Sequence, residues 1–306
     1  MPELNEVLKK ELQKSGSAVK TASVKHIDEL EKEIARLKEL SLLNEQFYSE
    51  NLYWLDFDYK NTMHDAESIL VISKPQFTTL LHFQHKGKNF CIPLPPTYVY
   101  SREINNVEKT LLNILSPYNY NIKITALPAK LLAVRTGLGM YGKNNICYVN
   151  GVGSFHRIFT FYSNMPLVED NWHEIKILPE CSKCGICIKA CPTKCIDSRR
   201  FLIHADKCIT NINEKEGDFP EWLDKNWHNS IVGCMRCQTV CPQNRDFIGK
   251  VEDEVTFAAE ETSMILESVP FNLLPNSLAQ KLSNIDLNEY YGVLSRNLSV
   301  LIEQKT

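Results

Sequence analysis

Cysteine is unusually abundant in this chain and is concentrated in one part of it. The sequence of 306 residues holds 11 cysteines, and nine of them lie between Cys181 and Cys241. A disulfide framework in a secreted protein would spread its cysteines over the whole fold. The crowding therefore predicts metal ligation by thiolates in a reducing compartment, and we expect a cytoplasmic protein.

The spacing of the first four of these cysteines indicates iron–sulfur chemistry. Cys181, Cys184, Cys187 and Cys191 precede Pro192 and form the pattern C-x2-C-x2-C-x3-C-P. This is the run found in bacterial ferredoxins, in which the fourth cysteine binds the other of two clusters.

A second, shorter set follows further along the chain. Cys234, Cys237 and Cys241 precede Pro242 in the pattern C-x2-C-x3-C-P, which lacks one ligand, and Cys208 in ADKCIT is the natural replacement. The ferredoxin crossover then predicts two [4Fe-4S] clusters. The predicted ligands are Cys181, Cys184, Cys187 and Cys241 for the first cluster, and Cys191, Cys208, Cys234 and Cys237 for the second.

Two alternatives accompany this interpretation. A pair of zinc sites is one, because C-x2-C pairs also bind zinc, although the crowding of thiolates in one turn-rich loop favours a cubane. A purely structural role for the clusters is the other. The remaining cysteines, Cys91, Cys147 and Cys195, are expected to be small buried hydrophobes, with Cys195 near the second cluster without ligating it.

The rest of the sequence predicts an α+β protein with a helical tail. Apolar residues at helical spacing predict two N-terminal helices, around Leu4 to Leu12 and Ile27 to Leu37. Short β-like runs then alternate with helical ones, which predicts an α/β sandwich. The strands are expected at 68–73, 78–83, 89–96 and 122–127, and the helices at 104–115, 128–136, 255–268, 277–285 and 290–303.

These patterns suggest four parts along the chain. We expect an N-terminal helical segment over 1–65, an α/β domain over 66–175, a double-cluster module over 176–250 and a helical tail over 251–306. No apolar run is long enough to span a bilayer, and the N-terminus lacks the apolar core of a secretory signal.

Glycines concentrate between Gly137 and Gly153, where five of the chain's 12 lie. They could let backbone amides approach a bulky ligand, with Lys143 neutralising a phosphate or carboxylate. They could equally form a tight turn before a hairpin over 146–161 that turns at Asn150-Gly151. The run matches neither the dinucleotide-binding fingerprint nor a Walker loop, so the residues alone leave both interpretations open.

Five segments in this order resemble the epoxyqueuosine reductase family, which is related to the reductive dehalogenases. They are GLGMYGKNN, GSFHRIFTF, CSKCGICIKACP, ADKCIT and GCMRCQTVCPQN, and the resemblance covers roughly residues 66–249. It implies a base-off cobalamin, used as cob(I)alamin, between a central domain resembling flavin reductases and the double-cluster module. It also implies an electron donor such as ferredoxin or flavodoxin.

The resemblance further implies which residues contact the corrin. In the family the glycine segment and the following hairpin do so, which indicates Gly137, Leu138, Gly139, Tyr141, Gly142, Lys143, Asn144 and Ser154 here. The family's proton-donating acid precedes a proline-led helix, and Thr125 stands at that position, so the sequence indicates no catalytic residue.

The substrate expected from the sequence is a small molecule rather than tRNA. The chain has 34 basic and 37 acidic residues and a net charge of −3, so no bulk charge attracts it to nucleic acid or to an anionic membrane. Family members that act on tRNA carry C-terminal helical repeats, whereas 56 residues follow Lys250 here, and they show no basic stripe.

The function expected is therefore a cobalamin-dependent iron–sulfur reductase. The alternative is a ferredoxin-type electron-transfer protein that reduces a corrinoid protein or another enzyme. A flavin or nicotinamide reductase is a third, because the central domain is expected to resemble flavin-binding folds, but no dinucleotide fingerprint accompanies it. A corrinoid that stays bound during purification would favour the reductase over the electron-transfer protein.

Overall fold

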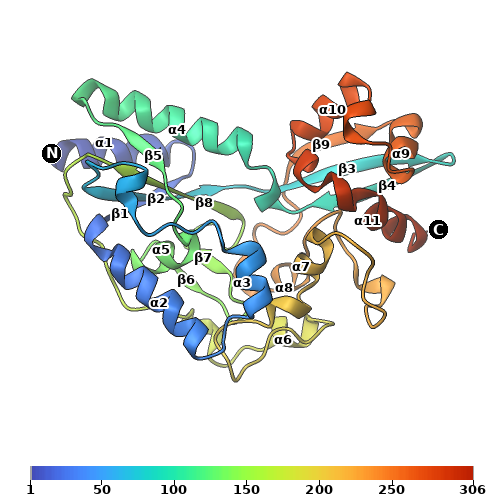
Figure 1. Cartoon of the computed structure of the whole chain (residues 1–306), viewed down its shortest axis with the longest axis horizontal. Coiled ribbons are helices and arrows are strands. Elements are labelled where there is room, and N and C mark those ends of the chain that lie inside the picture. The colour runs from blue at the N-terminus through green and yellow to red at the C-terminus, as the bar shows by residue number, and fades with distance from the viewer. Residues whose placement is uncertain (1, 306) are drawn as a thin grey trace. The chain divides into compact units, whose positions relative to one another are not determined.

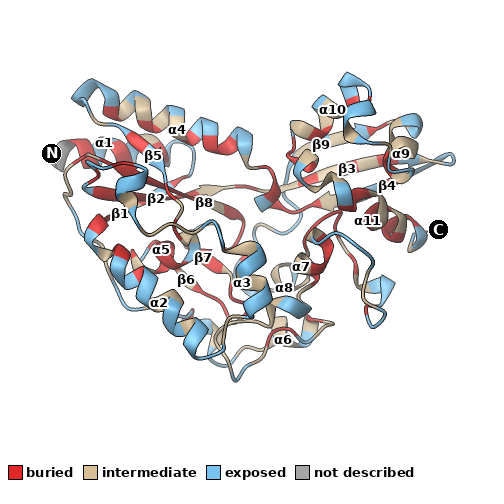
Figure 2. Cartoon of the chain, viewed as in Figure 1, coloured by how far each residue is buried: buried red, intermediate tan, exposed pale blue. Residues whose placement is uncertain are grey.

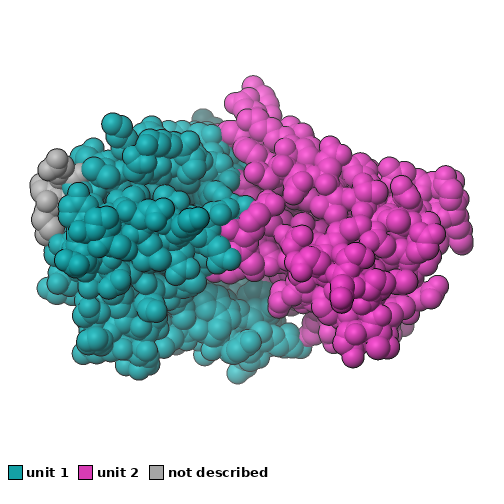
Figure 3. Space-filling model, turned by 90° about the horizontal axis from the view of Figure 1, so that it is seen from above, with its two compact units in different colours: residues 1–75, 103–185, 198–203 teal, residues 76–102, 186–197, 204–306 magenta. Residues whose placement is uncertain are grey.

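The computed structural model describes residues 2–305 and divides into two compact units (Figures 1 and 3). Unit 1 comprises the chain up to Pro75 together with residues 103–185 and 198–203. Unit 2 comprises residues 76–102, 186–197 and the chain from His204 onward. Each unit is therefore assembled from segments far apart in sequence.

Unit 1 is built on a four-stranded antiparallel sheet in the order β1-β2-β8-β5. Ile69 to Ile72 of β2 are fully buried, as expected for the apolar run of a central strand. Helices cover this sheet and show one buried and one exposed face, most clearly α4 (Figure 2). The strands are β1 (Ala18–Ser23), β2 (Ser68–Pro75), β5 (Ile122–Ile124) and β8 (His156–Ser163), and the helices are α1 (Pro2–Gln13), α2 (Ile27–Glu39), α3 (Glu45–Asn51), α4 (Ser101–Leu115) and α5 (Ala129–Arg135).

A two-stranded ladder, β6 (Gly139–Tyr141) and β7 (Cys147–Val149), completes unit 1. The turn expected at Asn150-Gly151 is present, with Val149 bridged to Gly153. The longer hairpin expected over 146–161 is wrong, because β7 pairs with β6 while β8 enters the large sheet between β2 and β5. The buried side chains of β8 explain this outcome: Phe159 and Phe161 are at most 2% exposed within that sheet.

Unit 2 contains a three-stranded sheet in the order β4-β3-β9. Strands β3 (Thr78–His85) and β4 (Lys88–Leu94) are antiparallel and joined by a turn at Lys86-Gly87, where both residues have positive φ. Strand β9 (Val251–Phe257) runs parallel to β3, and Phe83 stacks on Phe257 with ring centroids 4.6 Å apart. The helices of this unit are α6 (Ile186–Ala190), α7 (Ile209–Glu214), α8 (Arg236–Thr239), α9 (Ala259–Leu266), α10 (Asn276–Ser283) and α11 (Tyr291–Glu303).

The mixture of helices and strands is confirmed, but two expectations about their assembly are wrong. The helix expected over 255–268 begins only at Ala259, because the residues before it form β9. The runs at 68–73 and 78–83 were expected in one sandwich, but they become β2 and β3 of different sheets. Hydrophobic patterning shows that a segment forms a strand without showing which strand it pairs with. The likeness of the central domain to flavin reductases stays a prediction.

The described helices are all too short or too polar to cross a membrane.

Candidate functional site

The glycine segment lies directly beside the stretch that leads into the first cluster cysteines, within unit 1. The Tyr141 amide donates to the carbonyl of Lys176 at 2.9 Å, and the Leu178 amide donates to the carbonyl of Tyr141 at 2.9 Å. A parallel bridge pairs Tyr141 with Ile177 between these bonds. Strand β6 therefore fixes the start of the loop that carries Cys181.

Lys143 ties the same two segments together through its side chain. Its Nζ donates to the backbone carbonyl of Cys184 at 2.9 Å and to that of Ser182 at 3.3 Å. This ammonium group, an expected partner for a phosphate or carboxylate, thus binds carbonyl oxygens of the cysteine loop. The interaction places a positive charge next to a predicted cluster ligand.

Internal packing accounts for two of the glycines. A Cβ atom at Gly139 would lie 2.6 Å from Sγ of Cys147, and one at Gly142 would lie 2.6 Å from Oδ1 of Asn144. Any side chain at these positions would overlap its neighbours, so the backbone of the segment can fold this tightly only with glycine. Gly151, by contrast, has a positive φ and open space around it.

The segment also contains polar atoms that the protein leaves unsatisfied. Asn144 donates from Nδ2 to the hydroxyl of Tyr148 at 2.9 Å. Nδ2 of Asn145 and Nδ1 of His156 are buried and have no hydrogen-bond partner among the described residues. Because buried polar atoms are rarely left unpaired, these two are candidates for hydrogen bonds to a polar ligand.

Burial keeps the His156 imidazole neutral. It lowers the pKa of His156 to about 4, from an ordinary value near 6.5. Nε2 lies 3.1 Å from the carbonyl oxygen of Cys147 and donates to it, which leaves Nδ1 as an acceptor. His156 can therefore accept a hydrogen bond from a ligand at neutral pH.

The expected corrin contacts are found close together in unit 1, and most of them are buried. Leu138, Tyr141, Asn144 and Ser154 are at most 8% exposed. A cobalamin carries amide groups around its ring, and the unpaired donor of Asn145 and acceptor of His156 fit such groups. The residues present are therefore compatible with the cofactor.

Thr125 occupies the position where the resemblance places an acid. Its hydroxyl lies 2.6 Å from that of Thr160, and both residues are buried. A hydroxyl pair thus stands where the resemblance places a carboxyl group.

Two predicted ligands of the second cluster, Cys191 and Cys208, lie beside Cys195 in unit 2. Sγ of Cys191 lies 3.4 Å from Sγ of Cys195, which also makes a side-chain hydrogen bond with Cys208. The hydrogen bond from Cys195 lowers the pKa of Cys191 to about 5 and also lowers that of Cys208. Two predicted ligands of the second cluster therefore lie close together: Cys191 follows α6, and Cys208 directly precedes α7.

Polar groups around this set donate to its sulfur atoms. The Thr193 hydroxyl lies 3.4 Å from Sγ of Cys191, and Asn229 donates from Nδ2 to Sγ of Cys234 at 3.2 Å. The Thr210 side chain donates to Cys208. Sequence reasoning missed these donors, although Thr193 and Thr210 each stand two residues after a predicted ligand.

The first predicted ligand set falls in both units. Cys181 and Cys184 belong to unit 1, whereas Cys187 and Cys241 belong to unit 2. In the stretch from residue 2 to residue 305, no three His, Cys, Asp or Glu side chains are grouped to hold a single metal ion. A cubane binds each thiolate to a different iron, so its ligands lie farther apart than those of one ion. The individual ligand assignments stay predictions.

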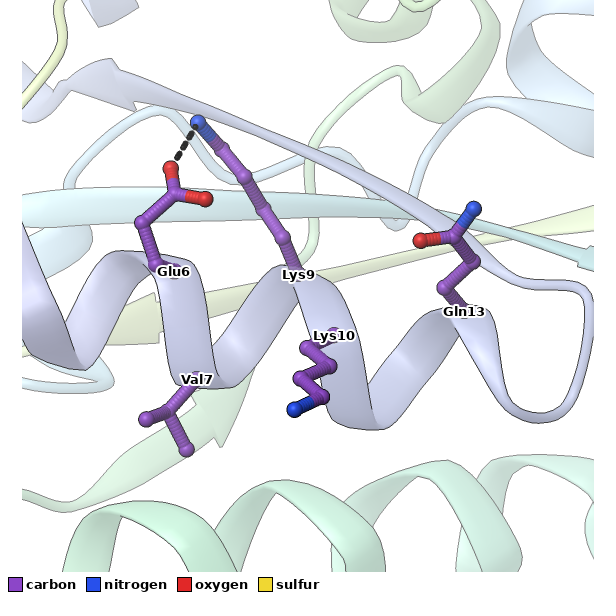
Figure 4. A pocket seen from close by; sticks show the side chains of 5 residues that line it. All are labelled: Glu6, Val7, Lys9, Lys10 and Gln13. Atoms are coloured by element: carbon purple, nitrogen blue, oxygen red, sulfur yellow. Dashed lines mark hydrogen bonds and ion pairs between the residues drawn. The ribbon is translucent and has the colours of Figure 1, made fainter.

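A shallow depression on α1 lies outside this site (Figure 4). One helix supplies its whole lining, and Lys9 forms an ion pair there with Glu6 at 3.2 Å. The lining residues are Glu6, Val7, Lys9, Lys10 and Gln13. They include no cysteine and no predicted cluster ligand.

Comparison with known families identifies the cysteine-rich segment. Residues 180–244 match the family described as a 4Fe-4S double cluster binding domain. The expectation of two [4Fe-4S] clusters is thereby confirmed.

Curated relatives carry the name epoxyqueuosine reductase. One from Atelocyanobacterium thalassa is 27% identical over 65% of this chain and 67% of its own length. One from Xanthomonas campestris is 32% identical over 47% and 40%, and one from Cellulophaga algicola is 24% identical over 89% and 90%. The match with this chain thus covers from 40% to 90% of the length of these three relatives. The resemblance to the epoxyqueuosine reductase-like family is confirmed.

Solved structures of the same name share the fold. The epoxyqueuosine reductase of Streptococcus thermophilus aligns with a TM-score of 0.66 at 18% identity, over 98% of this chain and 80% of its own. An epoxyqueuosine reductase bound to an epoxyqueuosine-modified tRNA-Tyr stem loop aligns with a TM-score of 0.67 at 19% identity, over 98% and 81%. The relatives are reductases by name, in agreement with the expected oxidoreductase.

The stem-loop complex corrects the expectation about the substrate. A small molecule was favoured and tRNA disfavoured because of the net charge of −3 and the short segment after Lys250. A relative with the same fold nevertheless binds a tRNA stem loop. Net charge averages over the whole surface, whereas phosphates are bound by local groups of Lys and Arg, so it is a poor guide to RNA binding.

Proposed function

We propose that this protein is a cobalamin-dependent iron–sulfur reductase, in which two [4Fe-4S] clusters would supply electrons and cobalamin, held at the glycine segment, would supply the reducing centre for the substrate. The main support is the attachment of the glycine segment to the first cysteine loop. Backbone bonds of Tyr141 and the Lys143 side chain bind residues 176–184 within unit 1. A cofactor held at the glycine segment would therefore lie beside Cys181 and Cys184.

Each part of the proposed site has a distinct task. The eight predicted cysteines hold the two clusters, and cobalamin, when bound, supplies a strongly reducing cobalt centre. Asn145 and His156 would bind polar groups of the cofactor through their unpaired atoms. Lys143 orients the cysteine loop. The proposed corrin contacts are Gly137, Leu138, Gly139, Tyr141, Gly142, Lys143, Asn144 and Ser154.

A modified tRNA nucleoside is the substrate that the relatives support. Their shared name refers to epoxyqueuosine, and one is solved with an epoxyqueuosine-modified stem loop. Conversion of an epoxide to an alkene removes its oxygen as water and consumes two electrons and two protons. Each [4Fe-4S] cluster carries one electron at a time, so the double-cluster module can store the pair.

The experiment is a reduction assay with the full chain. Protein with both clusters, cobalamin and dithionite as reductant is incubated with epoxyqueuosine-modified tRNA, and the nucleosides are identified by mass spectrometry. The proposal predicts loss of the epoxide oxygen, with no product from a Cys237→Ala variant and full product from Cys91→Ala. Cys91 lies outside the ligand sets and is exposed, which corrects the expectation that it is buried. Intact epoxyqueuosine with the loaded wild type would contradict this substrate.

A ferredoxin-type electron-transfer protein is the second candidate, and Thr125 favours it. A buried hydroxyl bonded to Thr160 stands where the family has its proton-donating acid. A pure carrier would reduce a corrinoid protein or another enzyme, and it would bind no cobalamin itself. Cobalt analysis of the purified protein separates the two candidates.

A further inference from the structure

Cys195 is a buried thiol that the predicted ligand sets leave unused. It is 3% exposed, and its Sγ lies 3.4 Å from Sγ of Cys191. It also makes a side-chain hydrogen bond with Cys208. One thiol outside the motif thus contacts two predicted ligands of the second cluster.

The backbone holds Cys195 in this position. The His204 amide donates to the Cys195 carbonyl at 2.8 Å, and the Lys194 amide donates to the Cys191 carbonyl at 3.3 Å. Lys194 has a φ of +56°, so the loop turns back sharply just before Cys195. All of these residues belong to unit 2. The conformation of the loop backbone therefore holds the two sulfur atoms in contact.

Only one of the two neighbouring sulfurs fits the ligand pattern. Cys191 occupies the fourth position of C-x2-C-x2-C-x3-C-P, whereas Cys195 lies three residues beyond Pro192. A non-ligand thiol at 3.4 Å can donate its S–H proton to a neighbouring thiolate. Such bonds to cluster sulfurs stabilise the reduced cluster, which carries one more negative charge, and so raise its reduction potential.

We propose that Cys195 is a positioning residue of the second cluster, which donates its S–H to the Cys191 thiolate, with Cys208 as a second acceptor, and raises the reduction potential of that cluster. The inference rests on the ligand set proposed above. It adds a tuning role for a residue that the cluster motif does not include.

The test is redox titration of the full protein with both clusters in place, followed by EPR. Cys195→Ala removes the donor, Cys195→Ser replaces it with a hydroxyl donor, and Cys91→Ala is the control at an exposed cysteine of the same unit. In Cys195→Ala we expect the ratio of reduced to oxidised second cluster at fixed potential to fall about tenfold, a shift of about 59 mV to lower potential for one electron. Cys195→Ser should recover much of this shift, and Cys91→Ala should show none.

Iron analysis separates the failure of this inference from that of the ligand set. Full iron content in Cys195→Ala with an unchanged potential would overturn the tuning role alone. Loss of one cluster from Cys195→Ala, with retention of both in Cys191→Ala, would make Cys195 the ligand and overturn the inference. A wild type that holds fewer than two clusters after reconstitution would contradict the proposed ligand set itself.

Discussion

The ammonium group of Lys143 lies 2.9 Å from the backbone carbonyl oxygen of Cys184 and joins the glycine segment to the cysteine loop. A second bond to the carbonyl of Ser182 strengthens this attachment. Hydrogen bonds that involve a charged group contribute about 1.5–3 kcal/mol each. We infer that Lys143 keeps the loop in the conformation that binds the first cluster.

Removal of this attachment should weaken the first cluster. Lys143→Met keeps the length of the side chain but deletes the donor, so we expect about half of the protein-bound iron to be released faster by a chelator. Lys143→Arg should release iron more slowly than Lys143→Met, because it retains a donor. Lys88→Met, at the exposed start of β4, is the control. Equal release from Lys143→Met and wild type would contradict this role.

Single cysteine replacements should each remove one cluster. Cys241→Ala is expected to lose the cluster of Cys181, Cys184 and Cys187, and Cys208→Ala to lose the other, with about four irons and four sulfides left in each case. The two single-cluster variants should therefore differ in their EPR spectra. Loss of the same cluster in both variants would show that the crossover is assigned wrongly.

Gly233, next to the predicted ligand Cys234, should not tolerate a side chain. A Cβ atom there would overlap the Tyr98 ring, which lies 2.7 Å away at Cε2, and φ is +69°. Gly233→Ala combines this overlap with the left-handed backbone, and each costs about 1–2 kcal/mol. Gly87→Ala shares the positive φ but has open space around it.

The comparison of these two variants isolates the contact with Tyr98. We expect the melting temperature to fall further in Gly233→Ala than in Gly87→Ala, with earlier loss of the second cluster only in the former. Equal melting temperatures would show that the loop relaxes around the added methyl group.

Acidic pH should destabilise the fold through His156. Its pKa of about 4 lies below the unfolded value near 6.5, so the unfolded chain binds a proton more readily between these values. The contribution to stability is complete above about pH 6.5 and is lost as the pH falls toward 4. From pH 7.5 to 5.5 the expected loss is about 1 kcal/mol.

Urea unfolding at pH 7.5, 6.5 and 5.5 checks this expectation. His156→Gln can keep the donation to the Cys147 carbonyl without titrating, so its free energy of unfolding should decline less with acid than that of the wild type. His228, whose pKa burial also lowers to about 4, is unchanged in both proteins and contributes equally. Parallel pH curves for the two proteins would contradict a role for His156.

Local patterns in the sequence predicted individual elements well. Apolar spacing around Leu4 to Leu12 and Ile27 to Leu37 corresponds to α1 and α2, and the run at 68–73 corresponds to β2. Strand β1 is one of the elements that the sequence did not predict, and its sequence AVKTAS mixes polar and small residues. It forms a strand by pairing with β2 along its full length, and no local property of its residues reveals that partner.

The sequence predicted the type of the candidate site but not the contacts between its residues. Spacing alone indicated the cluster cysteines, because a cubane needs several thiolates within a short loop. The same residues carried no sign that Lys143 would bind carbonyls at 182 and 184. They placed Cys195 near the second cluster, but they did not show that it would contact Cys191 and Cys208. These contacts depend on how separate loops fold together, which spacing does not encode.

The most direct measurement is metal analysis of protein purified without oxygen and with cobalamin supplied. We predict about eight irons and eight sulfides per chain, about one cobalt, and an absorption spectrum of base-off cobalamin. Eight irons without cobalt, even after soaking in excess cobalamin, would contradict the proposed reductase and leave a two-cluster electron carrier.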